Sequence, residues 1–318
     1  MAQDEFAIIK QYFSDIGKPA ANLALGIGDD AAVVEVPPAE QLVVSMDTLV
    51  SGVHFPSDSS PADIAYKALA VNLSDLAAMA ATPAWFLLAL TLPQNDTTWL
   101  QQFADGLRQT ADAFKLQLIG GDTCHGELSI SIQIAGLVPS GRYVTRGQAS
   151  PGDLILVTGE LGNAALGLAQ RQGEIELPQE LREKCLLALN RPQPRLELSP
   201  FLRQFASAAI DISDGLQGDL AHILKASGCG ANIRQPALPV NAWIVEQDAY
   251  HYALAAGDDY EICCCVPTKY RAEIENWNHE HADCRLNEIG EITESGYFLH
   301  DGEHLIDLGN AQGYQHFA

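Results

Sequence analysis

Residues 61–80 read PADIAYKALAVNLSDLAAMA, and their apolar side chains recur at three- and four-residue spacing. Ser60 and Pro61 at the start are typical of a helix cap and first turn, so we predict a buried helix over 61–80. Residues 128–134, LSISIQI, alternate apolar and polar side chains, which predicts a strand with one buried face. Together the two stretches indicate a mixed α/β (α+β) fold.

The same two patterns continue on both sides of these stretches. Residues 97–115 have helical spacing after Asp96, a residue type that commonly caps a helix. Further strands are predicted at 42–46, 85–91 and 116–119. In the second half the patterns predict helices at 161–171, 179–189 and 215–227, strands at 208–212, 261–266 and 285–291, and a hairpin that turns at Asp301 and Gly302.

The chain of 318 residues is longer than one ordinary domain, which favours two domains of unequal size. The segment PSGRYVTRGQASPG (139–152) is the richest in turn residues, and a new apolar strand follows it. We therefore predict two domains, 1–138 and 150–318.

Composition argues against several partners. The chain has 41 acidic and 18 basic residues, a net charge of −23 at pH 7, and such a field repels nucleic-acid backbones and anionic membranes. The longest apolar run, Ala84 to Leu92, is far shorter than the roughly 20 residues of a membrane-spanning helix. We expect no nucleic-acid partner and no membrane partner.

The seven cysteines form an odd set without a CxxC pair, so we expect reduced thiols. Cys263, Cys264 and Cys265 are consecutive and would point to alternate faces of a strand, which favours buried packing over a shared metal. Asp4 and Glu5 stand where a secretory signal needs positive charge, so we expect a cytoplasmic protein.

Several acidic residues occur where apolar strands end and glycine-rich turns begin. A carboxylate held among apolar neighbours without a basic partner is costly, and a proton or a metal ion usually relieves that cost. Several such groups favour a metal, and oxygen ligands select hard cations such as Mg²⁺, which also binds substrate phosphates. The pattern indicates a phosphate-handling enzyme. These acids are Asp29, Asp30, Asp47, Asp75, Asp122, Asp211, Asp214, Asp258 and Asp259.

Two further features suit a nucleotide phosphate. Gly120 and Gly121 precede Asp122 and supply flexible backbone whose amides can approach a phosphate. Arg146, in the basic turn segment, can clamp a phosphate by two parallel hydrogen bonds. Since the chain lacks GxxxxGK[ST], the nucleotide site is not predicted to be a P-loop.

Seven motifs occur in the order found in thiamine-monophosphate kinases, and the chain resembles that family over nearly its whole length. The resemblance implies the two-domain fold of the aminoimidazole ribonucleotide synthetase-like ATP-dependent enzymes. It also implies that the N-terminal domain pairs with its copy in a homodimer, and that the C-terminal α/β domain completes the active site. The motifs are GIGDDAA (26–32), MDTLVSGVHF (46–55), KALAVNLSDLAAM (67–79), LIGGDT (118–123), TRGQASPGD (145–153), AIDISDGL (209–216) and GDDYE (257–261), followed by GYQHF (313–317).

The resemblance further implies that ATP donates its γ-phosphoryl group directly to the phosphate of thiamine monophosphate, giving thiamine diphosphate, with several Mg²⁺ ions assisting. No general base is obligatory, because the acceptor phosphate is already anionic near neutral pH. Met46 stands where the family usually has Thr, and a thioether is a poor magnesium ligand. The motifs imply metal ligation by Asp30, Ser45, Asp47, Asp75, Asp122, Asp211 and Asp214, ATP contacts by Gly121, Asp122, Arg146 and Ser213, and thiamine-phosphate contacts by His54, Glu261 and Phe317.

Two alternatives stay open at this point. Another ATP-dependent enzyme of the same superfamily, of the aminoimidazole ribonucleotide synthetase type, would use similar chemistry. A non-catalytic, acidic protein that binds divalent cations would also account for the excess negative charge. Magnesium-dependent binding of an ATP analogue separates the enzyme from the cation-binding protein.

Overall fold

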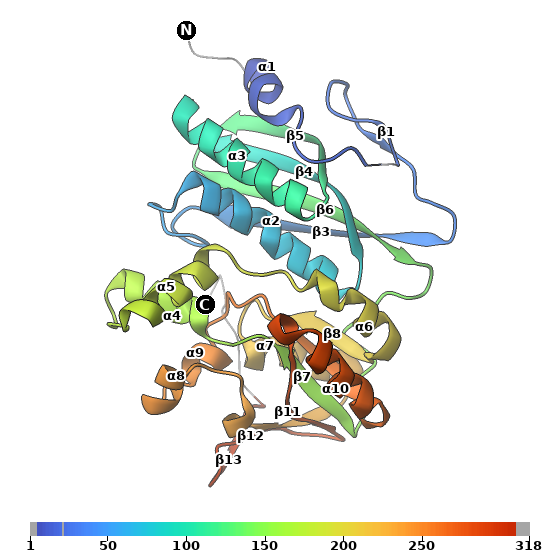
Figure 1. Cartoon of the computed structure of the whole chain (residues 1–318), viewed down its shortest axis with the longest axis vertical. Helices are drawn as coiled ribbons and strands as arrows, with labels where there is room; N and C mark the ends of the chain where they lie inside the picture. Colours follow the sequence, from blue (N-terminus) through green and yellow to red (C-terminus); the bar gives the residue numbers. More distant parts are fainter. Residues whose placement is uncertain (1–4, 21, 310–318) are drawn as a thin grey trace. The chain divides into compact units, whose positions relative to one another are not determined.

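The structure is a computed structural model that describes residues 5–20 and 22–309. It divides into two compact units (Figure 1). Of the described residues, unit 1 comprises those up to Leu76 together with Ala81–Arg142. Unit 2 comprises Ala77–Ala80 and those from Tyr143 onward.

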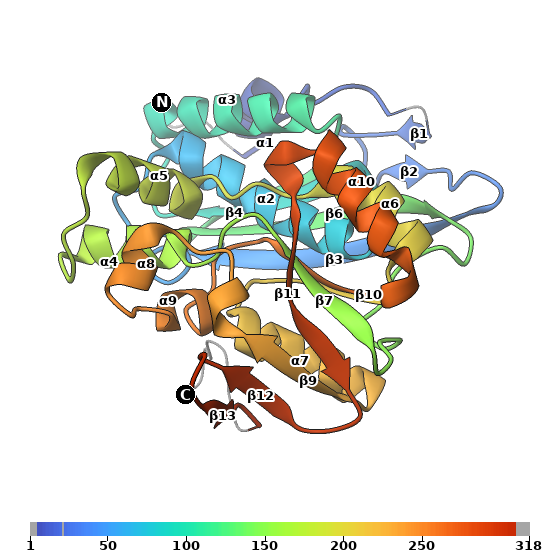
Figure 2. The same ribbon diagram turned by 60° about the horizontal axis from the view of Figure 1, so that its bottom comes forward.

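Unit 1 is built on a four-stranded sheet in the order β3-β6-β4-β5. Strand β6 pairs antiparallel with β3 and with β4, whereas β5 runs parallel to β4. Helices α2 and α3 lie on the same face of this sheet (Figures 1 and 2). The elements are α1 (Glu5–Ile8), the π-helix η1 (Ile9–Phe13), β1 (Leu23–Leu25), β2 (Val33–Val34), β3 (Glu40–Val50), α2 (Pro61–Ala78), β4 (Thr82–Leu92), α3 (Thr97–Ala113), β5 (Gln117–His125) and β6 (Ser129–Pro139).

The sequence patterns explain this packing. Ile130, Ile132 and Ile134 alternate along β6 and are at most 1% exposed, as expected for a strand with one buried face. Helix α3 begins at the predicted cap, because the Asp96 side chain accepts hydrogen bonds from two backbone amides of the first turn. A separate cluster around Trp85 is packed against the β1–β2 pair.

Unit 2 is built on a seven-stranded sheet in the order β13-β12-β9-β11-β7-β10-β8. Its neighbouring strands are antiparallel, except that β12 runs parallel to β9. The strands are β7 (Asp153–Thr158), β8 (Ala208–Asp211), β9 (Gly230–Arg234), β10 (Ile262–Pro267), β11 (Leu286–Thr293), β12 (Tyr297–His300) and β13 (Leu305–Asp307). The α-helices are α4 (Asn163–Gln172), α5 (Gln179–Asn190), α6 (Ser199–Phe205), α7 (Leu216–Ser227), α8 (Ala242–Glu246), α9 (His251–Leu254) and α10 (Arg271–Glu280), and the short 3₁₀ turns are η2 (Leu196–Leu198), η3 (Gln235–Ala237), η4 (Thr268–Tyr270) and η5 (Ala282–Cys284).

Both faces of the unit 2 sheet are buried. Helix α7 packs on one face, and α6 and α10 pack on the other (Figure 2). The three consecutive cysteines of β10 show the alternation: Cys263 and Cys265 belong to the α7 side and Cys264 to the opposite side. All three are fully buried, which confirms the prediction of buried packing.

The predicted mixed α/β fold and the principal predicted helices and strands are confirmed. Other elements are longer than predicted or were not predicted, among them the short strands β1, β2 and β9 and the short helices α1, α8 and α9. Strand β5 continues to His125, well past the predicted 116–119, because its last residues are polar and exposed and give no apolar pattern. Helices α6 and α10 were not predicted; α6 is short, and α10 has few apolar residues.

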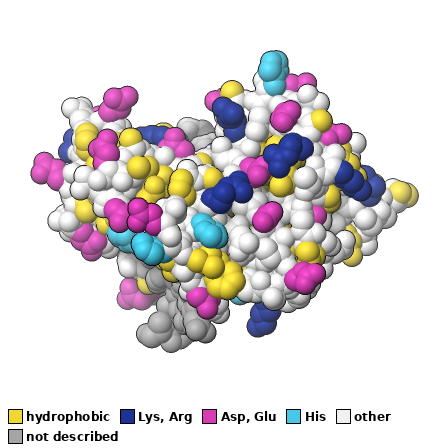
Figure 3. Space-filling model, turned by 90° about the horizontal axis from the view of Figure 1, so that it is seen from below, with side chains coloured by type: hydrophobic (Ala, Val, Ile, Leu, Met, Phe, Trp, Pro, Cys, Tyr) yellow, Lys and Arg dark blue, Asp and Glu magenta, His cyan; other side chains and the backbone are white. Residues whose placement is uncertain are grey.

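Figure 3 shows acidic and basic side chains interleaved on one face of the molecule. Among the described residues, no helix combines the length and the apolar character needed to cross a bilayer.

Candidate active site

In unit 1, the GIGDDAA loop and the LIGGDT strand border one cavity of about 840 Å³. Asp29 and Asp30 from the loop and Asp122 from β5 contribute to its wall, and Phe13 and Trp85 contribute apolar surface. Two motifs that are far apart in the sequence therefore share one concave surface.

Gly121 occupies a position in this wall that requires glycine. Its φ is +154°, and a Cβ atom there would lie 1.9 Å from the carbonyl oxygen of Leu88 on the neighbouring strand. The next residue, Asp122, has an exposed carboxylate that accepts hydrogen bonds from the Thr123 amide (2.9 Å) and the Cys124 thiol (3.1 Å). The glycine thus lets β5 approach β4 closely while Asp122 remains at the surface.

A second group of predicted ligands lies where β3 meets α2. The Ser45 hydroxyl donates to the Asp75 carboxylate, and the Asp47 amide donates to Asn72 Oδ1 at 3.1 Å. Burial, together with the nearby Asp75 carboxylate, raises the pKa of Asp47 to about 6. Two acids that repel each other, beside a hydroxyl oxygen, form an oxygen-only donor set of the kind that suits Mg²⁺.

The structure brings Ser45, Asp47 and Asp75 together, but metal ligation stays a prediction. Within the ranges 5–20 and 22–309, no group of three or more His, Cys, Asp or Glu side chains is arranged to hold a metal ion. His54, a predicted substrate contact, is half-buried, and its Nδ1 accepts from the Val50 amide at 2.9 Å. In the neutral ring the proton is therefore on Nε2, which can act as a donor.

In unit 2, the AIDISDGL and GDDYE motifs are joined by backbone hydrogen bonds. The Asp258 amide donates to the Ser213 carbonyl and the Tyr260 amide to the Ile212 carbonyl, each at 2.8 Å. Gly257 has φ +74°, and a Cβ atom there would lie 2.3 Å from the Ser213 carbonyl oxygen. This close approach holds the loop that carries Ser213 and Asp214 beside the GDDYE segment.

Asp219, in the first turn of α7, was not among the predicted site residues. Its Oδ2 accepts hydrogen bonds from the backbone amides of Ser213 and Asp214, both at 3.0 Å, and the residue is 3% exposed. Burial raises the pKa of Asp219 to about 7, although the hydrogen bonds from the Asp214 and Ser213 amides and, to a smaller extent, the Arg146 charge oppose that rise. The spacing SDGLQGD, with a second acid five residues after Asp214, was the signal available in the sequence.

Arg146 belongs to an exposed segment that is tied to the other end of α7. The Ser227 hydroxyl donates to the Arg146 carbonyl at 3.0 Å and accepts from the Ala149 amide at 3.1 Å. The backbone of this segment is therefore fixed while the Arg146 side chain stays exposed. Helix α7 thus has Ser213 and Asp214 at its N-terminal end and fixes the Arg146 backbone at its C-terminal end.

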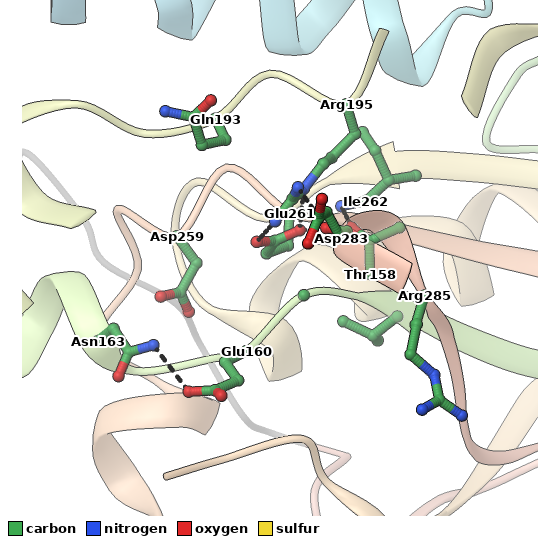
Figure 4. A network of polar contacts seen from close by, with 12 residues as sticks. Thr158, Glu160, Asn163, Gln193, Arg195, Asp259, Glu261, Ile262, Asp283 and Arg285 are labelled. Carbon is green, nitrogen blue, oxygen red and sulfur yellow. Dashed lines mark hydrogen bonds and ion pairs between the residues drawn. The ribbon is translucent and has the colours of Figure 1, made fainter. Parts of the chain in front are cut away.

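Glu261, a predicted substrate contact, is paired with a basic residue that the sequence did not single out (Figure 4). Arg195 donates from Nη2 to Glu261 Oε1 at 2.6 Å and from Nε to Oε2 at 2.7 Å. The Thr158 hydroxyl donates to Oε2 at 2.6 Å, and Arg195 also donates to the Asp283 carbonyl at 3.0 Å. Burial and this pair hold the Glu261 carboxylate in one orientation.

The structure gives less information on the two remaining predicted residues. Asp211 ends β8 and is 5% exposed. Phe317 lies outside the described residues, so its predicted substrate contact is not addressed by the structure.

Comparison with known families defines the class of protein. Residues 28–138 match the family described as AIR synthase related protein, N-terminal domain, and residues 150–301 match the corresponding C-terminal domain. Fold and site therefore define a two-domain protein of the AIR synthase related class.

Individual relatives define the family within that class. The chain is 45% identical to thiamine-monophosphate kinase from Escherichia coli O157:H7 and 47% identical to that from Salmonella typhimurium, over 100% of this chain and 99% of each relative. The crystal structure of thiamine-monophosphate kinase from Stenotrophomonas maltophilia K279a matches with a TM-score of 0.83 and 43% identity, covering 89% of this chain and 92% of that one. The chain belongs to the thiamine-monophosphate kinase family, which confirms the resemblance seen in its motifs.

A further solved structure, AaThiL complexed with AMPPCP and TMP, matches with a TM-score of 0.76 and 29% identity, covering 92% of each chain. The hydrogenase maturation protein HypE of E. coli matches with a TM-score of 0.77 but only 19% identity over 96% of each chain, which shows a shared fold alone.

Proposed function

We propose that this chain transfers the γ-phosphoryl group of ATP to the phosphate of thiamine monophosphate. An acceptor phosphate oxygen forms the new bond to the γ-phosphorus, the bond to the β,γ-bridging oxygen breaks, and the products are thiamine diphosphate and ADP. The observation that supports this most is 45% identity, over the full chain, to a thiamine-monophosphate kinase. The neighbour complexed with AMPPCP and TMP adds a nucleotide and a monophosphate on the same fold.

The chemistry of the site suits this reaction. A phosphate monoester and a triphosphate repel each other, so the reaction requires positioning and charge neutralisation more than proton transfer. Mg²⁺, when bound, would supply that neutralisation. In unit 1 we assign its ligation to Asp30, Ser45, Asp47, Asp75 and Asp122, and in unit 2 to Asp211 and Asp214.

The other assigned contacts also come from both units. We propose that Gly121, Asp122, Arg146 and Ser213 contact ATP, and that His54, Glu261 and Phe317 contact thiamine monophosphate. We keep the predicted division, in which residues 1–138 form the ATP- and magnesium-binding domain and residues 150–318 complete the active site, in part through Asp211, Ser213 and Asp214. The cationic thiazolium ring suits an acidic protein.

The proposal is tested by incubating the purified protein with ATP, Mg²⁺ and thiamine monophosphate. We expect thiamine diphosphate and ADP in equal amounts, and no product when EDTA removes the metal. Formation of ADP without thiamine diphosphate would point to another ATP-dependent enzyme of the superfamily. Binding of divalent cations without magnesium-dependent binding of AMPPCP would point to the non-catalytic alternative.

We also propose a homodimer formed through unit 1. Strand β3 lies at one edge of its sheet, and Leu42, Val44 and Met46 on one face of it are 40%, 49% and 60% exposed. An edge strand with three exposed apolar side chains in a row tends to associate with another chain, which then covers these side chains. A second copy of this strand is the partner that the family resemblance implies.

Val44→Lys is expected to shift the protein from dimer to monomer in sedimentation equilibrium, because a buried ammonium in the interface would be costly. Val245→Lys is the matched control, since Val245 is 52% exposed on α8 in unit 2. A monomeric wild type, or dissociation by the control alone, would contradict this interface.

The seven cysteines, all free thiols, support a cytoplasmic location as part of the same proposal.

A further inference from the structure

The loop that carries Ser213 and Asp214 connects β8 to α7 and is held from two directions. On one side, the Asp258 amide donates to the Ser213 carbonyl at 2.8 Å. On the other side, Asp219 Oδ2 accepts the amides of both Ser213 and Asp214 at 3.0 Å. The peptide groups on either side of Ser213 are therefore fixed by bonds to residues outside the loop.

These hydrogen bonds involve only backbone atoms of the loop. The side chains of Ser213 and Asp214 therefore take no part in them. Ser213 and Asp214 are both half-buried, whereas Asp219 beneath them is 3% exposed. Gly215, the next residue, has φ +106°, and a Cβ atom there would lie 2.8 Å from the Ala255 carbonyl carbon. The backbone therefore turns directly after Asp214. The Asp219 carboxylate accepts the two amides that come just before this turn.

We infer that Asp219 is a positioning residue, which fixes the Ser213–Asp214 backbone in the conformation that receives a magnesium-bound nucleotide. The inference rests on the proposed function, in which Ser213 contacts ATP and Asp214 binds the metal. Asp219 acts through hydrogen bonds to two amides and needs no contact with the metal or the substrates.

One feature of the geometry separates this role from that of a metal ligand. A single carboxylate oxygen, Oδ2, accepts both amides. The amide oxygen of Asn can replace that acceptor, whereas Ala provides none. A positioning role therefore tolerates Asp219→Asn better than Asp219→Ala, but a role as a charged ligand tolerates neither.

The experiment measures steady-state kinetics and AMPPCP binding in the presence of Mg²⁺ for Asp219→Ala and Asp219→Asn. We expect Asp219→Ala to raise the KM for ATP and the Kd for AMPPCP about tenfold, with the KM for thiamine monophosphate changed less than about twofold. Asp219→Asn is expected to recover most of that loss. Equal losses in both variants, or an unchanged Kd in Asp219→Ala, would overturn the inference.

Controls separate loop positioning from general stability. Ile223→Val removes a methyl group from the same helix at a fully buried position, and we expect it to lower the melting temperature without changing the Kd for AMPPCP. If Asp219→Ala does not fold, Asp219→Ser replaces it, because a Ser side chain is too short to reach both amides. A Kd raised equally by Ile223→Val would show that the effect is only structural and would overturn the inference.

Asp214→Asn tests the underlying proposal independently. We expect it to weaken magnesium-dependent AMPPCP binding. If Asp214→Asn binds as the wild type does, the assignment of the metal site is wrong. If Asp214→Asn is impaired and Asp219→Ala is not, the assignment stands and the positioning role fails.

Discussion

Asp47→Asn is expected to lower kcat/KM for thiamine monophosphate by on the order of 100-fold or more, because it removes one charged ligand from a reaction that depends on charge neutralisation. Asp47 is held where β3 meets α2, next to Asp75, with its backbone amide bonded to Asn72. Asn keeps the shape of the side chain and removes the repulsion from Asp75. The fold should therefore persist, and the circular dichroism spectrum and melting temperature should show this.

Asp112→Asn is the matched control, since Asp112 is an exposed acid on α3 in the same unit. We expect it to leave kcat/KM within about twofold of the wild type, because an exposed charge outside the assigned ligands is screened by solvent. Wild-type activity in Asp47→Asn would contradict the metal assignment in unit 1. Equal loss in both variants would show that net charge, and not ligation, is responsible.

Arg195→Met is expected to destabilise unit 2 by about 3–5 kcal/mol, because it leaves the Glu261 carboxylate buried without its partner. The two side chains are only 13% and 9% exposed. The measurement is the free energy of unfolding from urea denaturation without ligands. The double variant Arg195→Met, Glu261→Leu should regain much of the loss, since neither charge then stays buried alone.

The pair between Arg271 and Glu288 provides the comparison within the same unit. Its N–O distance is 2.5 Å, but the side chains are 50% and 29% exposed. Arg271→Met should therefore cost at most about 1 kcal/mol. A similar cost for Arg195→Met would mean that the buried pair contributes no more than a surface pair does.

The sequence predicted the elements whose burial leaves a regular pattern. The strand over 128–134 buries one face and the helix over 61–80 is buried on nearly all sides, and the structure has β6 and α2 there. Helix α10 was not predicted because only Ile274 and Trp277 in it are buried, too few to show a helical period. Pattern reasoning detects burial, so it misses elements that bury little.

The site was predicted unevenly for a related reason. The motifs identified Ser45, Asp47 and Asp75, and the structure brings these residues together. Single-sequence reasoning did not find the partners that hold site residues in place, such as Arg195, which is 66 positions from Glu261. Contacts of that range follow from the packing of the sheet and leave no local spacing to read.

The three consecutive cysteines in β10 can report when the strands of the unit 2 sheet separate. Cys263, Cys264 and Cys265 are fully buried on an interior strand, while Cys124 in unit 1 is exposed. An alkylating reagent should therefore label Cys124 at once and reach the three β10 thiols only when the strands separate. The rate of the slow labelling, followed by mass spectrometry, would measure how often the sheet opens locally in the native protein.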